Sequence, residues 1–111
     1  MKIRSWLTLL AVTPLVAFGA GSVGTTAIKT VDVEGYLGFV AIFGSFANNP
    51  DSCGSSSLVI VRKTDAWYTD TYALTVASLA SGTPMNFYVS GCYATPWGYT
   101  APIVQSAQMN P

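Results

Sequence analysis

Residues 67–92, with the sequence WYTDTYALTVASLASGTPMNFYVSGC, decide the fold of this chain. In the first half of this stretch, apolar side chains recur at steps of three and four residues, which places them along one side of an α-helix. These side chains are Tyr68, Tyr72, Leu74, Val76, Leu79 and Ala80. The sequence therefore predicts a helix that buries this apolar stripe against the rest of the domain.

A glycine and a proline mark the end of this helix. Gly82 readily adopts the left-handed conformation that closes a helix, and Pro84 prevents the helix from continuing. Apolar and polar residues then alternate over residues 85–90 with the two-residue period of a half-buried strand. We therefore expect a strand that follows the helix and ends at Cys92.

Four other stretches have the alternation or the β-branched and aromatic composition of strands, and they span residues 28–34, 37–46, 58–62 and 101–109. Together with the strand after the helix, they give five strands, with the single helix between the third and the fourth. Each parallel pair needs a crossover connection, so one helix implies mostly antiparallel pairing. The predicted fold is mainly β with one α-helix: a small, five-stranded antiparallel barrel of the oligonucleotide and oligosaccharide-binding (OB) type, with one disulfide.

The first 21 residues are predicted to be a secretory signal peptide. Two basic residues precede an uncharged apolar run at residues 6–20, and small residues follow, where a signal peptidase can cut. A membrane anchor is the alternative, but the run is shorter than the ~20 apolar residues that span a bilayer and contains Pro14. We therefore expect a secreted or periplasmic protein in which residues 22–111 form one OB-like domain without a membrane span. Its first residues, up to Thr26, are expected to be loose.

The two cysteines, Cys53 and Cys92, are predicted to form a disulfide bond. Exported proteins meet an oxidising compartment, and a domain of about 90 residues gains considerable stability from a covalent cross-link. A catalytic or metal-binding thiol pair is the alternative, but it requires close spacing or histidine partners, and the sequence contains no histidine. Residues 47–57 have the Asn, Pro, Gly and Ser content of a loop, so the bond is expected to tie this loop to the strand after the helix.

The charge balance argues against a nucleic-acid partner. Without Lys2 and Arg4, which belong to the leader, three basic residues oppose five acidic ones, a net charge of −2. Nucleic-acid binding requires clustered Lys and Arg to neutralise phosphates, whereas the basic cluster here is only the pair Arg62 and Lys63. We therefore expect no nucleic-acid binding.

The lack of histidine also argues against catalysis. Ser-His-Asp and Cys-His arrangements are impossible, and the usual nitrogen ligands of a catalytic metal are missing. The remaining carboxylate pair, Asp32 and Glu34, stands two residues apart on one face of a strand and does not flank a substrate bond as a glycosidase requires. We therefore expect no enzyme, metal or cofactor, and a solvated strand face at these two residues.

Tyrosine and tryptophan are abundant between residues 67 and 99. Such side chains suit binding sites with one apolar face and one wet edge, as sugar rings present. Trp97 lies between Pro96 and Gly98, whose turn chemistry favours a position at the surface. Packing in the core is an equal alternative for Tyr93, Trp97 and Tyr99. The candidate ligand-binding residues are Tyr93, Trp97 and Tyr99, together with Asn48 and Asn49.

Residues 72–93, YALTVASLASGTPMNFYVSGCY, resemble the B subunits of A-B type bacterial toxins, in particular the subtilase cytotoxin and typhoid toxin group. The shared features are an apolar helix, a small-Gly-x-Pro step at residues 81–84, and then Tyr88, Trp97, Pro102, Val104 and, more faintly, the stretch GYLGFVAIF at residues 35–43. This resemblance implies an OB-type barrel, a homo-pentameric ring, a companion catalytic subunit and recognition of cell-surface glycans, often sialylated. Where the family has a glycan-binding serine, this chain has Leu37, which argues against sialic acid as its ligand.

The sequence thus leads to two hypotheses about function. The first is a secreted, non-catalytic glycan-binding protein that resembles a toxin B subunit and uses surface aromatic side chains. The alternative is a secreted or periplasmic module that binds or inhibits a protein partner through the same aromatic surface.

Overall fold

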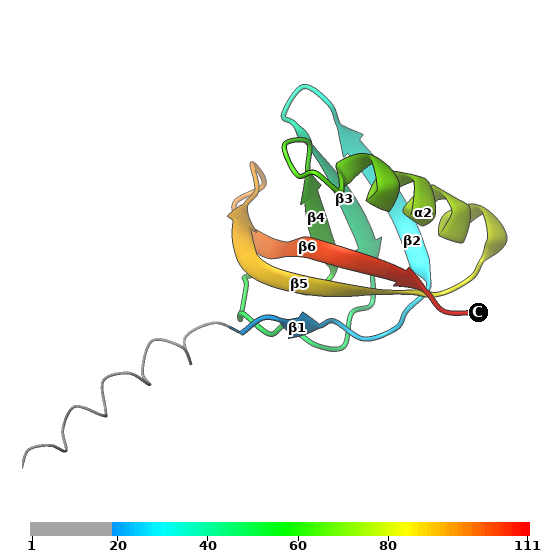
Figure 1. Cartoon of the computed structure of the whole chain (residues 1–111). Coiled ribbons are helices and arrows are strands. Elements are labelled where there is room, and N and C mark those ends of the chain that lie inside the picture. Colours follow the sequence, from blue (N-terminus) through cyan, green and yellow to red (C-terminus); the bar gives the residue numbers. More distant parts are fainter. Residues whose placement is uncertain (1–18) are drawn as a thin grey trace, which may run out of the picture.

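The computed structural model describes residues 19–111, so all but the last three residues of the predicted signal peptide lie outside the described residues. Within these residues, six strands form one mixed sheet, and a single helix packs on β2, β4 and β6 (Figure 1). The elements are β1 (Gly21–Ser22), β2 (Ile28–Glu34), β3 (Phe39–Gly44), β4 (Leu58–Arg62), α2 (Tyr68–Ser81), β5 (Met85–Ala94) and β6 (Thr100–Met109). No helix within these residues has the length and apolarity needed to cross a bilayer.

The sheet corrects the prediction of a five-stranded antiparallel barrel. The strand order is β1-β5-β6-β4-β3-β2, and β4 pairs with β6 in parallel while the other neighbours are antiparallel. The parallel pair arises because α2 carries the chain from β4 to the far side of β6, and the β5–β6 hairpin then reverses direction once more. β1 and β2 are the two edges, so the sheet is not a closed barrel. Among residues 19–111, one isolated bridge outside the named strands pairs Thr26 with Met85 at the start of β5, through two backbone hydrogen bonds of 2.9 Å.

The sixth strand comes from residues that we expected to be loose. Gly21 and Ser22 pair with Val89 and Tyr88 of β5, and the next residue, Val23, is completely buried. The backbone N–H of Val23 donates to the carbonyl of Phe87 at 3.0 Å. The composition of residues 21–26, which are small or polar apart from Val23, does not predict a strand. Pairing with the distant β5 and the burial of Val23 order this segment.

The stretch predicted as a strand over residues 37–46 begins later in the structure. Residues 35–38 form the turn between β2 and β3, with the N–H groups of Leu37 and Gly38 donating to the carbonyl of Glu34. Gly38 has a φ of 83°, in the left-handed region that glycine tolerates best. Leu37 therefore lies exposed in a turn, outside the strand in which the resemblance to the toxin family placed it.

The interior strands are buried on both faces. One cluster lies on the helix side of the sheet and includes Val40, Ile42, Val59, Val61, Phe87, Val89 and Val104. The other lies on the opposite face and consists of Phe39, Ala41, Leu58, Ile60 and Ala101. Since neighbouring residues of a strand point to opposite faces, burial on both explains why β3 and β4 are continuously apolar.

The end of the helix confirms its prediction. Gly82 has a φ of 74°, and its N–H donates to the carbonyl of Ser78 at 2.8 Å, which closes the last turn of α2. In β5, the buried residues are Met85, Phe87 and Val89, as the alternation predicted.

The predicted face of the helix, in contrast, is wrong at its centre, although Tyr68 and Leu74 of the apolar stripe do pack against the first core cluster. The buried residues of α2 are Thr71, Thr75 and Ser78, while the central residues of the apolar stripe are exposed: Tyr72 by 37%, Val76 by 40% and Leu79 by 43%. Two of these three buried hydroxyls have recorded partners, because Thr75 Oγ1 donates to the carbonyl of Thr71 at 2.7 Å and Ser78 Oγ donates to the carbonyl of Thr83. Satisfied hydroxyls on small side chains can be buried at little cost. We refer to Tyr72, Val76 and Leu79 as the outer stripe.

The predicted disulfide is confirmed. Cys53 and Cys92 are bonded, with their Cα atoms 5.6 Å apart, so the loop between β3 and β4 is tied to β5. The Asp51 carboxylate strengthens this connection by accepting hydrogen bonds of 2.6 Å from the N–H groups of Gly19 and Gly91. The cross-link thus holds the turn end of the β5–β6 hairpin against the loop between β3 and β4.

Candidate functional site

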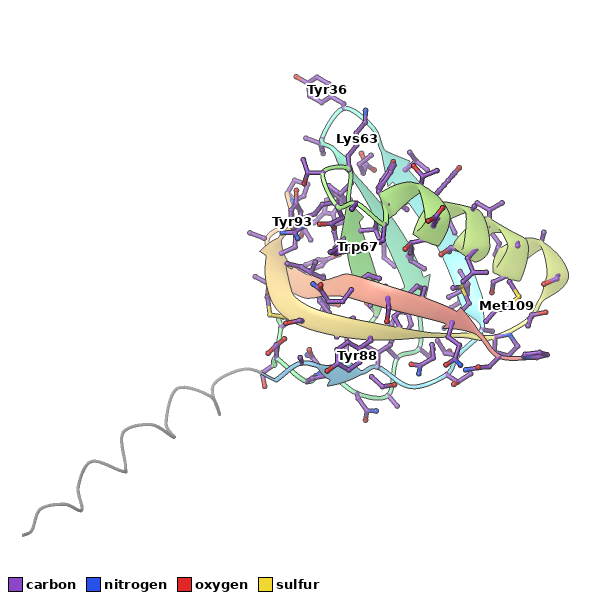
Figure 2. The ribbon with its side chains drawn as sticks, in the orientation of Figure 1. Tyr36, Lys63, Trp67, Tyr88, Tyr93 and Met109 are labelled. Carbon is purple, nitrogen blue, oxygen red and sulfur yellow. A yellow bond between two sulfur atoms is a disulfide. The ribbon has the colours of Figure 1, made fainter. Side chains whose placement is uncertain are left out.

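Three aromatic side chains gather at the β5–β6 hairpin around a fourth from β3. The ring of Phe39 lies 5.4 Å from the ring of Tyr93 and 5.7 Å from that of Trp97, and the rings of Trp97 and Tyr99 are 6.2 Å apart. These centroid distances are typical of aromatic pairs that stabilise each other. Figure 2 shows Tyr93 at the end of β5, beside the turn that leads to β6. We refer to Tyr93, Trp97 and Tyr99 as the hairpin cluster.

The turn that carries Trp97 is fixed by hydrogen bonds. The N–H and the hydroxyl of Thr95 both donate to the carbonyl of Tyr99, at 3.0 and 2.7 Å, and the same hydroxyl accepts a bond from the N–H of Trp97 at 3.3 Å. Gly98 has a φ of 94°, which permits the tight reversal after the tryptophan. The indole ring is therefore presented by a well-defined turn.

The side chains of the hairpin cluster, and Phe39 beneath them, differ in how far they are buried. Phe39 is only 1% exposed, and Tyr93 and Tyr99 are half-buried against the second core cluster. Trp97 is 41% exposed at the tip of the hairpin. Both interpretations of these residues are thus partly realised, since the tyrosines pack on the sheet and the tryptophan offers ring surface to solvent.

The two asparagines serve the loop between β3 and β4. Asn49 exchanges two hydrogen bonds with the backbone of Cys53, at 2.7 and 3.0 Å, so both ends of its amide are occupied. Asn48 donates from Nδ2 to the carbonyl of Ser22 at 3.3 Å, which directs it toward β1. Within residues 19–111, neither side chain hydrogen-bonds to the hairpin cluster, and the structure does not join them to it.

The carboxylates of Asp32 and Glu34 lie together on one face of β2. A hydrogen bond with Asp32 raises the pKa of Glu34 above its ordinary value, and partial loss of hydration and the like charge of Asp32 raise this pKa further. The two groups lie on the same strand face and do not flank a substrate-sized gap. No group of three or more potential metal ligands occurs among residues 19–111.

Replacing Asp32 by alanine is expected to lower the pKa of Glu34 toward its ordinary value. The folded protein binds this proton more tightly than the unfolded chain does, so the pair stabilises the fold below the ordinary glutamate pKa, and this contribution is lost as the pH rises through the raised value. An NMR titration of the Glu34 carboxyl carbon measures the shift. An unchanged pKa in Asp32→Ala would show that the two carboxyls do not interact.

We did not predict from the sequence the pocket that lies beside α2 in the structure. It lies between the helix and β6, and its lining includes Trp67, which we had not separated from the other aromatic residues. Its helix residues and its β6 residues are more than 30 positions apart along the chain, so no local pattern predicts that they meet. The only sequence signal for the pocket was Trp67 itself. It stands at the start of the helix, and other residues already fill the apolar positions in the interior of the helix.

Comparison with known proteins found no matching family model, no matching curated protein and no matching solved structure.

Proposed function

We propose that this chain is a secreted or periplasmic, non-catalytic protein that binds cell-surface glycans through the hairpin cluster. The observation that carries the proposal is an exposed Trp97 on a turn fixed by hydrogen bonds, beside two tyrosines that rest on the buried ring of Phe39. Indole and phenol rings combine an apolar face with a polar edge, which matches the alternation of C–H and O–H groups on a sugar. A rigid support lowers the entropy lost on binding.

A toxin-like B subunit is the architecture that we propose for it. The order β2-β3-β4-β6-β5 with a helix between β4 and β5, and the bridge from Thr26 to Met85, favours an OB-like topology in a curled sheet. The resemblance of residues 72–93 to toxin B subunits favours a ring of five copies and a companion catalytic subunit.

The outer stripe supports self-assembly. It exposes three large apolar side chains, and Asp70 is the only charged residue of the helix that carries them. Adjacent exposed apolar side chains on a surface helix are typical of an interaction surface. Because the stripe bears no charge, copies of the chain meet there without electrostatic repulsion.

Trp97→Ala is expected to weaken retention on the preferred glycan by about 30-fold, because loss of a central tryptophan costs about 2 kcal/mol or more. A glycan array identifies the ligand, and titration of that glycan measures the loss. Tyr88→Ala is the matched control, since Tyr88 is also exposed but lies outside the cluster. Wild-type binding by Trp97→Ala, or no retention of the wild-type protein on any glycan, would contradict the proposal.

The hairpin cluster also suits the alternative of a protein-binding or inhibitor module, because tryptophan and tyrosine are enriched at the centres of protein interfaces. In that case the glycan array gives no signal, and Trp97→Ala abolishes capture of a single exported protein in a pull-down while Tyr88→Ala does not. The glycan array and the pull-down therefore separate the two functions, and the two variants show in either assay whether binding depends on Trp97.

A further inference from the structure

The pocket beside α2 has the size of a single small ring. Its volume is about 220 Å³, below the ~300–1,000 Å³ of pockets that hold drug-sized ligands. Trp67, Asp70 and Leu74 line it from the helix, and Gln105, Ser106 and Ala107 line it from β6. None of these residues belongs to the hairpin cluster or to the outer stripe, so the pocket is a separate feature of the surface.

Trp67 has a fixed orientation in this pocket. Its indole Nε1 donates to the carbonyl of Val104 at 2.8 Å, which uses the only hydrogen-bonding atom of the side chain. Figure 2 shows Trp67 between the start of α2 and β6. What the half-buried ring offers to the pocket is therefore apolar surface, held in place before any ligand arrives.

Polar groups lie on the same lining as the apolar surface. The Asp70 carboxylate accepts hydrogen bonds, the Gln105 amide both donates and accepts, and the Ser106 hydroxyl does both. The ion pair recorded within residues 19–111 joins Arg62 to Asp65, so no basic side chain there neutralises Asp70. Leu74 and Ala107 complete the apolar part of the lining.

The apolar surface, the polar groups and the negative charge of the lining favour some classes of ligand over others. No Lys or Arg lines the pocket while Asp70 brings a negative charge, so phosphates and acidic sugars are disfavoured. A neutral pyranose has an apolar C–H face for Trp67 and hydroxyls for the polar groups, and each of these groups then gains a partner. We infer that the pocket beside α2 binds one neutral sugar ring, stacked on Trp67 and hydrogen-bonded by Asp70 and Gln105.

This inference does not rest on the proposed function of the hairpin cluster, and NMR distinguishes the two. The labelled protein is titrated over the millimolar range with the methyl glycosides of glucose, galactose, mannose and N-acetylglucosamine, and separately with choline. At least one glycoside is expected to shift the indole N–H of Trp67 and the side-chain amide of Gln105 in a saturable way. The same shifts are expected in Trp97→Ala, whatever that substitution does to binding at the hairpin.

Substitutions then identify the groups that bind. Asp70→Ala and Gln105→Ala are expected to weaken binding at least tenfold, with the larger loss for the charged group. Thr69→Ala and Gln108→Ala are matched controls, because both residues are exposed, lie on the same two elements and do not line the pocket. The inference is overturned if no glycoside shifts Trp67, if only choline does, or if Asp70→Ala and Gln105→Ala bind like the wild-type protein. Shifts confined to Tyr93, Trp97 and Tyr99 would overturn it and leave the proposed function intact.

Discussion

Replacing Cys53 and Cys92 together by serine is expected to lower the free energy of unfolding by about 4 kcal/mol. The disulfide joins positions 39 residues apart, and in the chain-entropy model a loop of this length restricts the unfolded chain by that amount. A small domain has only about 5–15 kcal/mol of stability in total, so the loss is a large share of it. The melting temperature should fall by roughly 15–30 °C.

Thermal unfolding followed by circular dichroism measures this change. Adding a reductant to the wild-type protein should reproduce the melting temperature of the double variant, while Ser52→Ala, next to Cys53 in the same loop, should leave it within a few degrees. The hairpin cluster should lose glycan binding before the fold is lost, because the disulfide holds the end of the hairpin that carries the cluster. Two free thiols in the purified protein, with no effect of reductant on melting, would contradict the prediction.

Local signals in the sequence predicted much of the fold. Gly82 and Pro84 fixed the end of α2, because a left-handed cap and a missing N–H are properties of single residues. The alternation from Met85 to Val89 predicted β5 for a similar reason, since apolar side chains at every second position indicate a strand with one buried face. The disulfide was predicted from the two cysteines together with the expected export, because an oxidising compartment favours the bond and only one pairing of two cysteines exists.

The buried face of the helix was not predictable from apolar spacing. The spacing favoured Tyr72 and Val76, but the structure buries Thr71 and Thr75, whose small side chains allow the helix to lie close to the sheet. Periodicity counts apolar residues and does not register that a threonine hydroxyl can be satisfied by the preceding turn of its own helix. Propensity and pattern were overridden here by tertiary packing.

Long-range pairing accounts for the other differences. β1 exists because Gly21 and Ser22 meet β5, more than 60 residues away, and the parallel pairing of β4 with β6 depends on where the hairpin is inserted. The hairpin cluster also combines a residue that local signals predicted with a long-range contact that they did not. Trp97 was identified from its flanking turn residues, whereas its support by Phe39 joins residues 58 positions apart and left no local trace.

Val76→Lys is expected to weaken self-association by at least a hundredfold. Val76 is at the centre of the outer stripe, and a lysine there would bring an unpaired charge into the contact between copies, at a cost of about 3–5 kcal/mol. The isolated chain should tolerate the change, since Val76 is 40% exposed and lysine favours helices more than valine does. Sedimentation or light scattering should show the wild-type protein as an assembly, with five copies expected for the ring, and the variant as a monomer.

The separation between association and folding makes this experiment decisive. Ser45→Lys adds the same charge at an exposed position outside the outer stripe and should leave the assembly intact, so net charge alone is not the cause. If Val76→Lys melts at the wild-type temperature when both are monomeric, the effect belongs to the interface and not to the helix. A wild-type protein that remains monomeric at every concentration, or an assembly that tolerates Val76→Lys, would mean that the outer stripe does not join copies of this chain. The stripe would then lose its role in the proposed ring, while the glycan-binding test at Trp97 would be unaffected.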